Sequence, residues 1–183
     1  MKLRIYLFFL VGALSFLSLS CSSDSSTGSV PISGESSSVE LAERIISLSP
    51  TATEILFAIE AGDQVVAVDD QSNFPAEAPM TSLSGFTPNI ESIAEYQPDL
   101  VVASYDPGDL VSGLEALDVT TVLQPAASSM EDTYSQINEL GVLTGRQSEA
   151  SELIERIKSD LDGIASNAAE EGLTYYHEID NTY

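Results

Sequence analysis

The chain contains few of the residues from which common enzyme and metal sites are built. Its 183 residues include no tryptophan, one cysteine, one histidine and six basic residues. Because Cys21 is the only cysteine, the chain cannot form an internal disulfide. Because His177 is the only histidine, these residues cannot supply several histidine ligands to one metal, and we expect neither a metal nor a resident cofactor.

The scarcity of basic residues excludes a further class of partner. With 29 acidic residues the formal net charge is −23. A surface this negative repels the phosphate backbone, so we expect no nucleic-acid partner. It also repels anionic lipid, so attachment to a membrane would require a covalent anchor.

Sequence signatures of catalysis are missing as well. The chain has no G-x-S-x-G elbow, no G-x-G-x-x-G fingerprint and no Walker loop. We therefore expect a non-enzymatic protein with no catalytic residues. A surface-anchored α/β hydrolase remains the enzymatic alternative, but its nucleophile and base would have to follow Tyr183.

Residues 1–20 have the pattern of a secretory signal. Lys2 and Arg4 precede an apolar run over residues 5–19, which is shorter than the about 20 residues of a membrane span. Small residues lead directly into Cys21, which predicts a bacterial-type lipoprotein signal with Cys21 as the lipidated residue. Ordinary signal cleavage beside an incidental cysteine is the alternative.

Residues 21–40 form a linker between this lipidation site and the first periodic segment. Nine of the seventeen residues 22–38 are serine, so the segment has little apolar surface to bury and should stay flexible. A flexible linker after a lipid anchor lets a folded domain move near a membrane. We therefore expect an extracytoplasmic protein, attached by lipid to the outer face of the cell membrane.

Residues 41–145 alternate between strand and helix patterns, which predicts one α/β lobe. Short apolar runs predict the strands Arg44–Leu48, Val65–Val68, Leu100–Ala103 and Thr120–Leu123. Helical spacing between and after them predicts the helices Thr51–Ala61, Asn89–Tyr96, Gly108–Leu117 and Ser128–Gly141. Capping boxes, Thr51 with Glu54 and Ser128 with Glu131, open two of these helices. The pattern is typical of a doubly wound parallel sheet covered on both faces.

A longer helix follows over about residues 146–172. Leu153, Ile154, Ile157, Leu161 and Ile164 give it one apolar stripe. Glu171 and Gly172 end it, and Thr174–Ile179 then begins a strand with no partner before Tyr183. We interpret residues 173–183 as the start of a second, missing lobe that the long helix joins to the first.

Four segments in this order resemble one known family. They are the run Arg44–Ala58, the strand with Asp69-Asp70, the tripeptide Asn73-Phe74-Pro75, and the run Pro88–Ala103 with Gln97-Pro98-Asp99. Together they are similar to the periplasmic binding proteins of ABC importers for iron-siderophore complexes, haem and cobalamin, over residues 44–183. The resemblance implies a monomer that captures a small-molecule ligand between two lobes and delivers it to an ABC permease in the membrane.

Carried over by position, the resemblance also implies site residues. The ligand cleft of this lobe would be lined by Ser49, Pro50, Thr51, Asn73, Phe74, Tyr105 and Asp106, with Gly85 and Phe86 on a further cleft loop. Glu91 matches a surface glutamate that docks against arginines of the permease. Plain alternatives exist: helix capping explains Thr51, a helix dipole explains Glu91, and Phe74 and Phe86 could be core aromatics.

Charge and aromatic content narrow the expected ligand. After the signal, the basic residues are Arg44, Arg146, Arg156 and Lys158, and none lies on a loop that follows a predicted strand. This lobe therefore favours a large, nearly neutral ligand, with a corrinoid first and a ferric hydroxamate siderophore next. A related zinc- or manganese-type binding protein is the main rival, although residues 44–170 contain no histidine.

Overall fold

The computed structural model of the protein describes residues 41–167. In chain order the elements are β1 (Ile45–Leu48), α1 (Pro50–Ala58), the short 3-10 helix η1 (Gly62–Gln64), β2 (Val65–Asp69), β3 (Met80–Leu83), α2 (Ile90–Ala94), β4 (Leu100–Ala103), α3 (Leu110–Glu115), β5 (Thr120–Leu123), α4 (Met130–Thr144) and α5 (Gln147–Ser166). The predicted signal, Cys21, the serine-rich linker, His177 and the strand Thr174–Ile179 lie outside the described residues.

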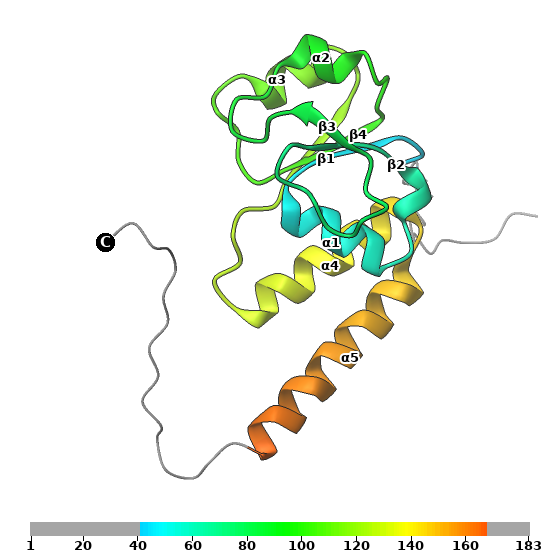
Figure 1. The fold of residues 1–183 in the computed structure, drawn as a ribbon, viewed down its shortest axis with the longest axis vertical. Coiled ribbons are helices and arrows are strands. Elements are labelled where there is room, and N and C mark those ends of the chain that lie inside the picture. The colour runs from blue at the N-terminus through cyan, green and yellow to red at the C-terminus, as the bar shows by residue number, and fades with distance from the viewer. Residues whose placement is uncertain (1–40, 168–183) are drawn as a thin grey trace, which may run out of the picture. The chain divides into compact units, whose positions relative to one another are not determined.

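The five strands form one parallel sheet in the order β3-β2-β1-β4-β5. Helices cover both faces, with α1 and α4 on one side and α2 and α3 on the other (Figure 1). Each face has its own hydrophobic core: Ile45, Leu56 and Leu140 belong to one, and Ile46, Ile93 and Leu114 to the other. The predicted doubly wound α/β lobe is therefore confirmed.

Strand order locates the switch point of this sheet. The chain adds β2 and β3 on one side of β1, then crosses back and adds β4 and β5 on the other. The winding therefore reverses between β1 and β4. In open parallel sheets, ligands bind beyond the carboxyl ends of the strands at such a switch point. Residues that follow Leu48 and Ala103 are thus the first candidates for ligand contact.

The sequence prediction missed β3, which was placed in a long loop. Its four residues, Met80–Leu83, are largely exposed except for Leu83, so the apolar run that identifies a buried strand is absent. Among residues 41–167 the strand lies at an edge of the sheet and pairs with β2. The Thr81 hydroxyl strengthens this pairing by donating to the Val68 carbonyl oxygen at 2.7 Å.

Both predicted capping boxes begin at the wrong residue. Ser49, not Thr51, is the N-cap of α1: its hydroxyl oxygen accepts from the Ala52 amide, and Pro50 occupies the first helical turn, where a missing N–H costs nothing. In α4 the cap is Ser129, whose hydroxyl oxygen accepts from the Asp132 amide at 3.1 Å. Asp132 in turn accepts from the Ser128 amide at 2.9 Å.

Helix α4 also extends past Gly141, where the sequence prediction ended it. A Cβ at Gly141 would lie 2.6 Å from that of Ala150, so glycine here allows α4 and α5 to pack closely. The helix ends instead at Gly145, whose φ of 73° is the left-handed conformation typical of a C-terminal cap.

The apolar stripe of α5 is buried along its first half. Leu153 and Ile154 pack in the core beside α4, whereas Leu161 and Ile164 are exposed. No helix within residues 41–167 is both long and apolar enough to cross a membrane.

Candidate ligand-binding site

Loops that follow β1, β2 and β3 meet closely at the carboxyl edge of the sheet. The tightest contact is at Gly85, two residues after β3. A Cβ there would lie 2.6 Å from the Leu48 carbonyl oxygen at the end of β1, and 2.5 Å from Asp69 Oδ2 at the end of β2. Only glycine allows this approach, so the predicted site residue Gly85 brings its loop against the two neighbouring strand ends.

Asp69 is the polar centre of this contact. It is 2% exposed, and its Oδ1 accepts from the amides of Ser72 at 2.9 Å and Gln71 at 3.3 Å. Both bonds fix the turn that leads to Asn73 and Phe74. Asp69 is thus a buried structural acceptor, whereas the neighbouring Asp70 is exposed.

A buried hydroxyl network ties the same turn to helix α1. Thr53 Oγ1 lies 2.8 Å from Ser47 Oγ and 3.1 Å from Ser72 Oγ, and all three residues are buried. Ser47 Oγ donates to the Ser49 carbonyl oxygen at 3.0 Å. Buried polar groups that are fully paired make a segment rigid. The end of β1, the start of α1 and the turn after β2 therefore form one rigid unit.

Three aromatic side chains on successive loops of this edge are exposed. The exposed fractions are 63% for Phe74, 69% for Phe86 and 42% for Tyr105, so none is a core residue of the described structure. The Tyr105 hydroxyl donates to the Phe86 carbonyl oxygen at 2.7 Å, which joins the loop after β4 to the loop after β3. Exposed aromatic side chains at the carboxyl edge of such a sheet are candidates for contact with another molecule.

The remaining predicted site residues differ in what their side chains do. Pro50, Thr51 and Asn73 are exposed. Asp106 is occupied locally, because its Oδ1 accepts from the amides of Gly108 at 2.8 Å and Leu110 at 3.1 Å and so shapes the turn before α3. Ser49 is buried as the cap of α1.

A pocket of about 280 Å³ lies where β1, β4 and β5 end, beside α1 and α4. Its polar lining comes from Ser49, Thr51, Ser104, Gln124, Thr133 and Gln136, and small apolar side chains complete it. The predicted site residues include Ser49 and Thr51 but not Ser104, Gln124, Thr133 or Gln136. The available signal was the position of Gln124 directly after a strand.

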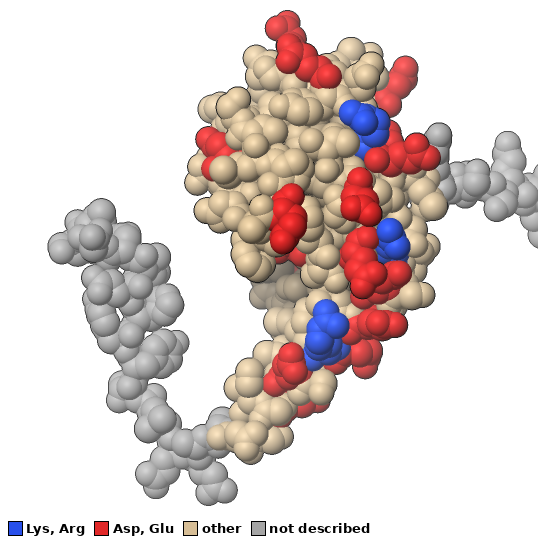
Figure 2. All heavy atoms as spheres, turned by 45° about the vertical axis from the view of Figure 1, so that its right-hand side comes forward, with Lys and Arg blue, Asp and Glu red and all other residues tan. Residues whose placement is uncertain are grey.

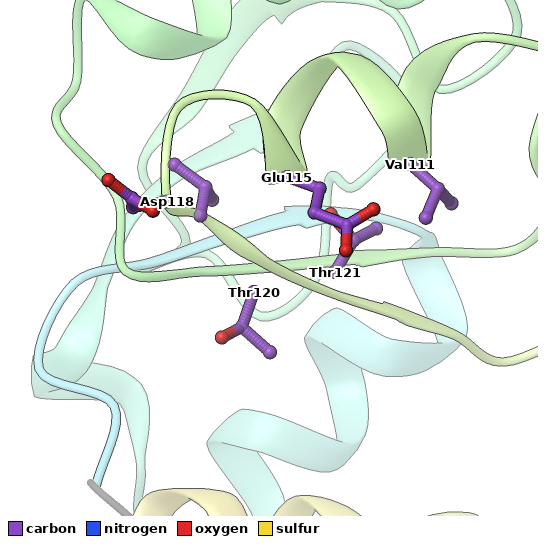
Figure 3. A pocket seen from close by; sticks show the side chains of 6 residues that line it. Val111, Glu115, Asp118, Thr120 and Thr121 are labelled. Atoms are coloured by element: carbon purple, nitrogen blue, oxygen red, sulfur yellow. The ribbon is translucent and has the colours of Figure 1, made fainter.

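A second pocket, of about 430 Å³, lies elsewhere, between α3 and β5 (Figure 3). Val111 and Glu115 of α3 line it together with Thr120 and Thr121 at the amino end of β5. The Thr121 hydroxyl oxygen is buried without a hydrogen-bond partner among residues 41–167. This pocket lies at the amino end of β5, whereas the candidate site lies at the carboxyl ends of the strands. The two are therefore separate.

Charges are arranged so that the loops after the strands carry no cation. Arg44 lies at the opposite end of β1, where its guanidinium donates to the carbonyl oxygens of Gln97 at 2.9 Å and Tyr96 at 2.6 Å. Lys158, on α5, lies 5.3 Å from the Tyr134 ring centroid and 2.9 Å from Glu155. On the face shown in Figure 2, Lys and Arg side chains stand among more numerous Asp and Glu side chains. Within residues 41–167 no group of three or more His, Cys, Asp or Glu is placed to hold a metal.

Glu91 lies apart from these loops, on the helix that covers the other face of the sheet. It is exposed in the first turn of α2, which Asn89 caps by accepting from the Ser92 amide at 2.8 Å. An acid is favoured at this position by the helix dipole. Asn89 supplies the N-cap of this helix, so the Glu91 side chain is not the cap.

A five-stranded, doubly wound lobe with uncharged polar groups and exposed aromatics at its switch point is the architecture of a ligand-binding α/β protein. The sequence profile described as "Periplasmic binding protein" matches residues 45–181, and the chain belongs to that family. This membership places it among binding proteins rather than enzymes, as the sequence predicted.

Relatives agree with this assignment. An uncharacterized ABC transporter substrate-binding lipoprotein of Bacillus subtilis, YvrC, is 30% identical over 131 residues, which are 69% of this chain and 42% of the relative. A vitamin B12-binding protein of Vibrio parahaemolyticus is 29% identical over 145 residues, or 76% of this chain and 52% of the relative. The chain thus spans about half the length of the curated relatives it matches.

Solved structures of periplasmic binding proteins have the same fold as this lobe. A possible iron-binding (periplasmic solute-binding) protein of Staphylococcus epidermidis superposes with a TM-score of 0.65 at 27% identity, covering 73% of this chain and 54% of that one. The periplasmic vitamin B12-binding protein BtuF of Vibrio cholerae gives a TM-score of 0.57 at 28% identity, covering 68% and 50%.

Proposed function

We propose that the chain is the first lobe of the substrate-binding component of an ABC importer. In this role it captures a small ligand against the carboxyl edge of its sheet and presents that ligand to a membrane permease. The observation that supports this proposal most strongly is the carboxyl edge of the sheet. There Phe74, Phe86 and Tyr105 are exposed on three successive loops beside the β1–β4 switch point. Family membership and the named relatives support the same role.

For the ligand we propose a corrinoid, with a ferric hydroxamate siderophore as the next candidate. The aromatic side chains suit a large and partly apolar surface. The loops after the strands carry no lysine or arginine, so a multiply charged anion such as a ferric catecholate would meet carboxylates without a compensating cation. At 4 Å and an effective dielectric constant of 20, one such like-charge pair costs about 4 kcal/mol.

For delivery we propose that Glu91 docks against basic residues of the permease. Its exposure on α2 leaves the carboxylate free to meet another protein surface. Charge pairs at the rim of an interface act mainly on association rate and orientation. Ligand affinity and transfer to the permease should therefore respond differently to a change at Glu91.

The experiment is uptake into vesicles that contain the permease, with the full-length protein, meaning this chain with any residues that follow Tyr183. Glu91→Arg should reduce uptake several-fold and leave ligand affinity unchanged. The control Glu152→Arg makes the same change of charge at an exposed position of α5 and should leave uptake intact. Equal uptake by both variants would return Glu91 to a helix-start acid.

We further propose an extracytoplasmic location with a lipid anchor at Cys21, which lies outside the described residues. The Bacillus subtilis relative is itself named a lipoprotein. Cys21→Ala should move the protein from the membrane fraction to the soluble fraction. A Cys21→Ala protein that stays in the membrane after a carbonate wash would contradict the anchor.

A further inference from the structure

The pocket at the ends of β1, β4 and β5 has an unusual lining for so acidic a protein. Its polar side chains are hydroxyls and amides, and none of its lining residues carries a charge. Hydroxyls can donate or accept, so they do not select a ligand group by themselves. The selectivity of the pocket therefore depends on how its two glutamine amides are oriented.

The orientation of Gln124 is fixed by what lies behind it. Gln124 is 6% exposed, and its Nε2 donates to Glu139 Oε2 at 3.0 Å and to the Gln136 carbonyl oxygen at 3.1 Å. An ionised carboxylate and a carbonyl only accept, so the nitrogen, and not the oxygen, must face both. Both N–H groups are thereby used, and the group that Gln124 can offer a ligand is its carbonyl oxygen.

Gln136 has one of its two N–H groups occupied within the lobe. Its Nε2 donates to the Pro125 carbonyl oxygen at 2.7 Å, which holds the loop between β5 and α4 against the helix. The second N–H group of Gln136 remains a donor, so Gln124 is the amide whose two N–H groups are both occupied and whose Oε1 alone faces a ligand. The Thr51 and Ser104 hydroxyls, which come from α1 and from the loop after β4, can donate to a ligand oxygen.

We propose that this pocket receives a neutral group that donates a hydrogen bond, such as a primary carboxamide carried by the ligand. This inference rests on the proposed function and deepens it. The carboxamide nitrogen donates to Gln124 Oε1, and its oxygen accepts from the hydroxyls. A carboxylate of the same shape places its second oxygen, which cannot donate, against Gln124 Oε1 and finds no cation in the pocket, so it binds more weakly.

A fragment titration tests the pocket without the proposed ligand. The ¹⁵N-labelled full-length protein is titrated with propionamide and, separately, with propionate, while NMR follows its amide signals. Propionamide should give saturable shifts at Thr51, Ser104 and the Gln124 side-chain amide. Propionate should bind about tenfold more weakly, the size expected for one unmatched buried polar group. Absence of saturable propionamide shifts, or equal binding of propionate, overturns the proposal.

Two variants test whether propionamide binds in this pocket. Ala127→Leu places a larger side chain in the pocket at an exposed position and should abolish the propionamide shifts. Ala116→Leu makes the same change at an exposed position after α3 and should preserve them. If Ala127→Leu disturbs the fold, Thr51→Val, which removes one hydroxyl from an exposed helix position, takes its place and should weaken propionamide binding. Shifts that neither Ala127→Leu nor Thr51→Val alters contradict the location.

The outcome separates this proposal from the proposed function. If propionamide binds selectively but the full-length protein does not bind a corrinoid, the pocket stands and the ligand class is wrong. If a corrinoid binds but propionamide and propionate are not distinguished, the ligand class stands and the pocket assignment is wrong.

Discussion

The hydroxyl of Tyr105 donates to the carbonyl oxygen of Phe86 at 2.7 Å, joining two loops whose strands are not neighbours in the sheet. β3 lies at one edge and β4 lies beyond β1, so the bond crosses the carboxyl ends of the strands between them. Two of the three exposed aromatics are thereby held together before any ligand is present. The proposed ligand surface is thus preorganised in part by the lobe itself.

Tyr105→Phe should loosen this surface while keeping the ring. We expect a loss of about 0.5–1 kcal/mol in the free energy of unfolding, as for one partly exposed hydrogen bond. Faster amide exchange at residues 84–87 should accompany it. Urea denaturation and hydrogen exchange measure the two effects. Tyr96→Phe, at the opposite end of the sheet near Arg44, is the control and should leave residues 84–87 unchanged.

Asp69 and Asp70 are adjacent carboxylates, and we expect alanine substitutions at the two positions to change the free energy of unfolding by different amounts. Asp69→Ala removes a buried acceptor of two backbone amides and should cost about 1–3 kcal/mol of stability. Asp70→Ala, at an exposed position, should stay within about 0.5 kcal/mol of wild type. Chemical denaturation distinguishes them, and equal losses would show that the carboxylate of Asp69 does not hold the turn.

Gly85 and Gly163 provide a second matched pair. Gly85→Ala places a methyl group 2.6 Å from the backbone oxygen of Leu48 and should destabilise the lobe by about 1–3 kcal/mol. Gly163→Ala, in α5 with nothing within 4 Å, should instead stabilise it by about 0.5–1 kcal/mol. Thermal and urea unfolding of the two variants give the signs directly. A neutral Gly85→Ala would mean that the loop after β3 can move away from β1.

Acid titration should reveal the cap of α4. Hydrogen bonds from the Ser128 amide and from Ser129 hold the pKa of Asp132 below its ordinary value of 3.8. Since the folded pKa is depressed, the stabilisation is complete above pH 3.8 and is lost as the pH falls through the lower folded value. Ser129→Ala should raise the pKa of Asp132 toward 3.8. Carboxyl carbon NMR checks this, with no change expected for Asp132 in Ser135→Ala.

The contrast between strands and caps shows what the sequence could predict. Four of the five strands were found because their residues form apolar runs, whereas the exposed Met80–Leu83 has no such run and depends on its pairing with β2. Ser49 and Ser129 were missed as caps because a neighbouring hydroxyl residue, Thr51 or Ser128, fits the same sequence pattern. Backbone geometry chooses between such neighbours, and the pattern does not record it.

Only part of the candidate site could be predicted, because some of its residues are brought together by the three-dimensional fold alone. Exposed aromatics after strands follow from strand positions, so Phe74 and Tyr105 could be anticipated. The buried role of Asp69 and the pocket role of Gln136 depend on loops that meet only in three dimensions. Asp106 accepts two amides of its own turn through Oδ1, and its contact with a ligand stays a prediction.

Ligand discrimination tests the central claim most directly. The full-length protein is titrated with cyanocobalamin and, separately, with a ferric tris-catecholate, and each mixture is then gel-filtered. The lobe offers aromatic and neutral polar groups but no cation on its ligand loops, so the corrinoid should co-elute with the protein and the catecholate should not. Co-elution of the catecholate without the corrinoid would contradict the account.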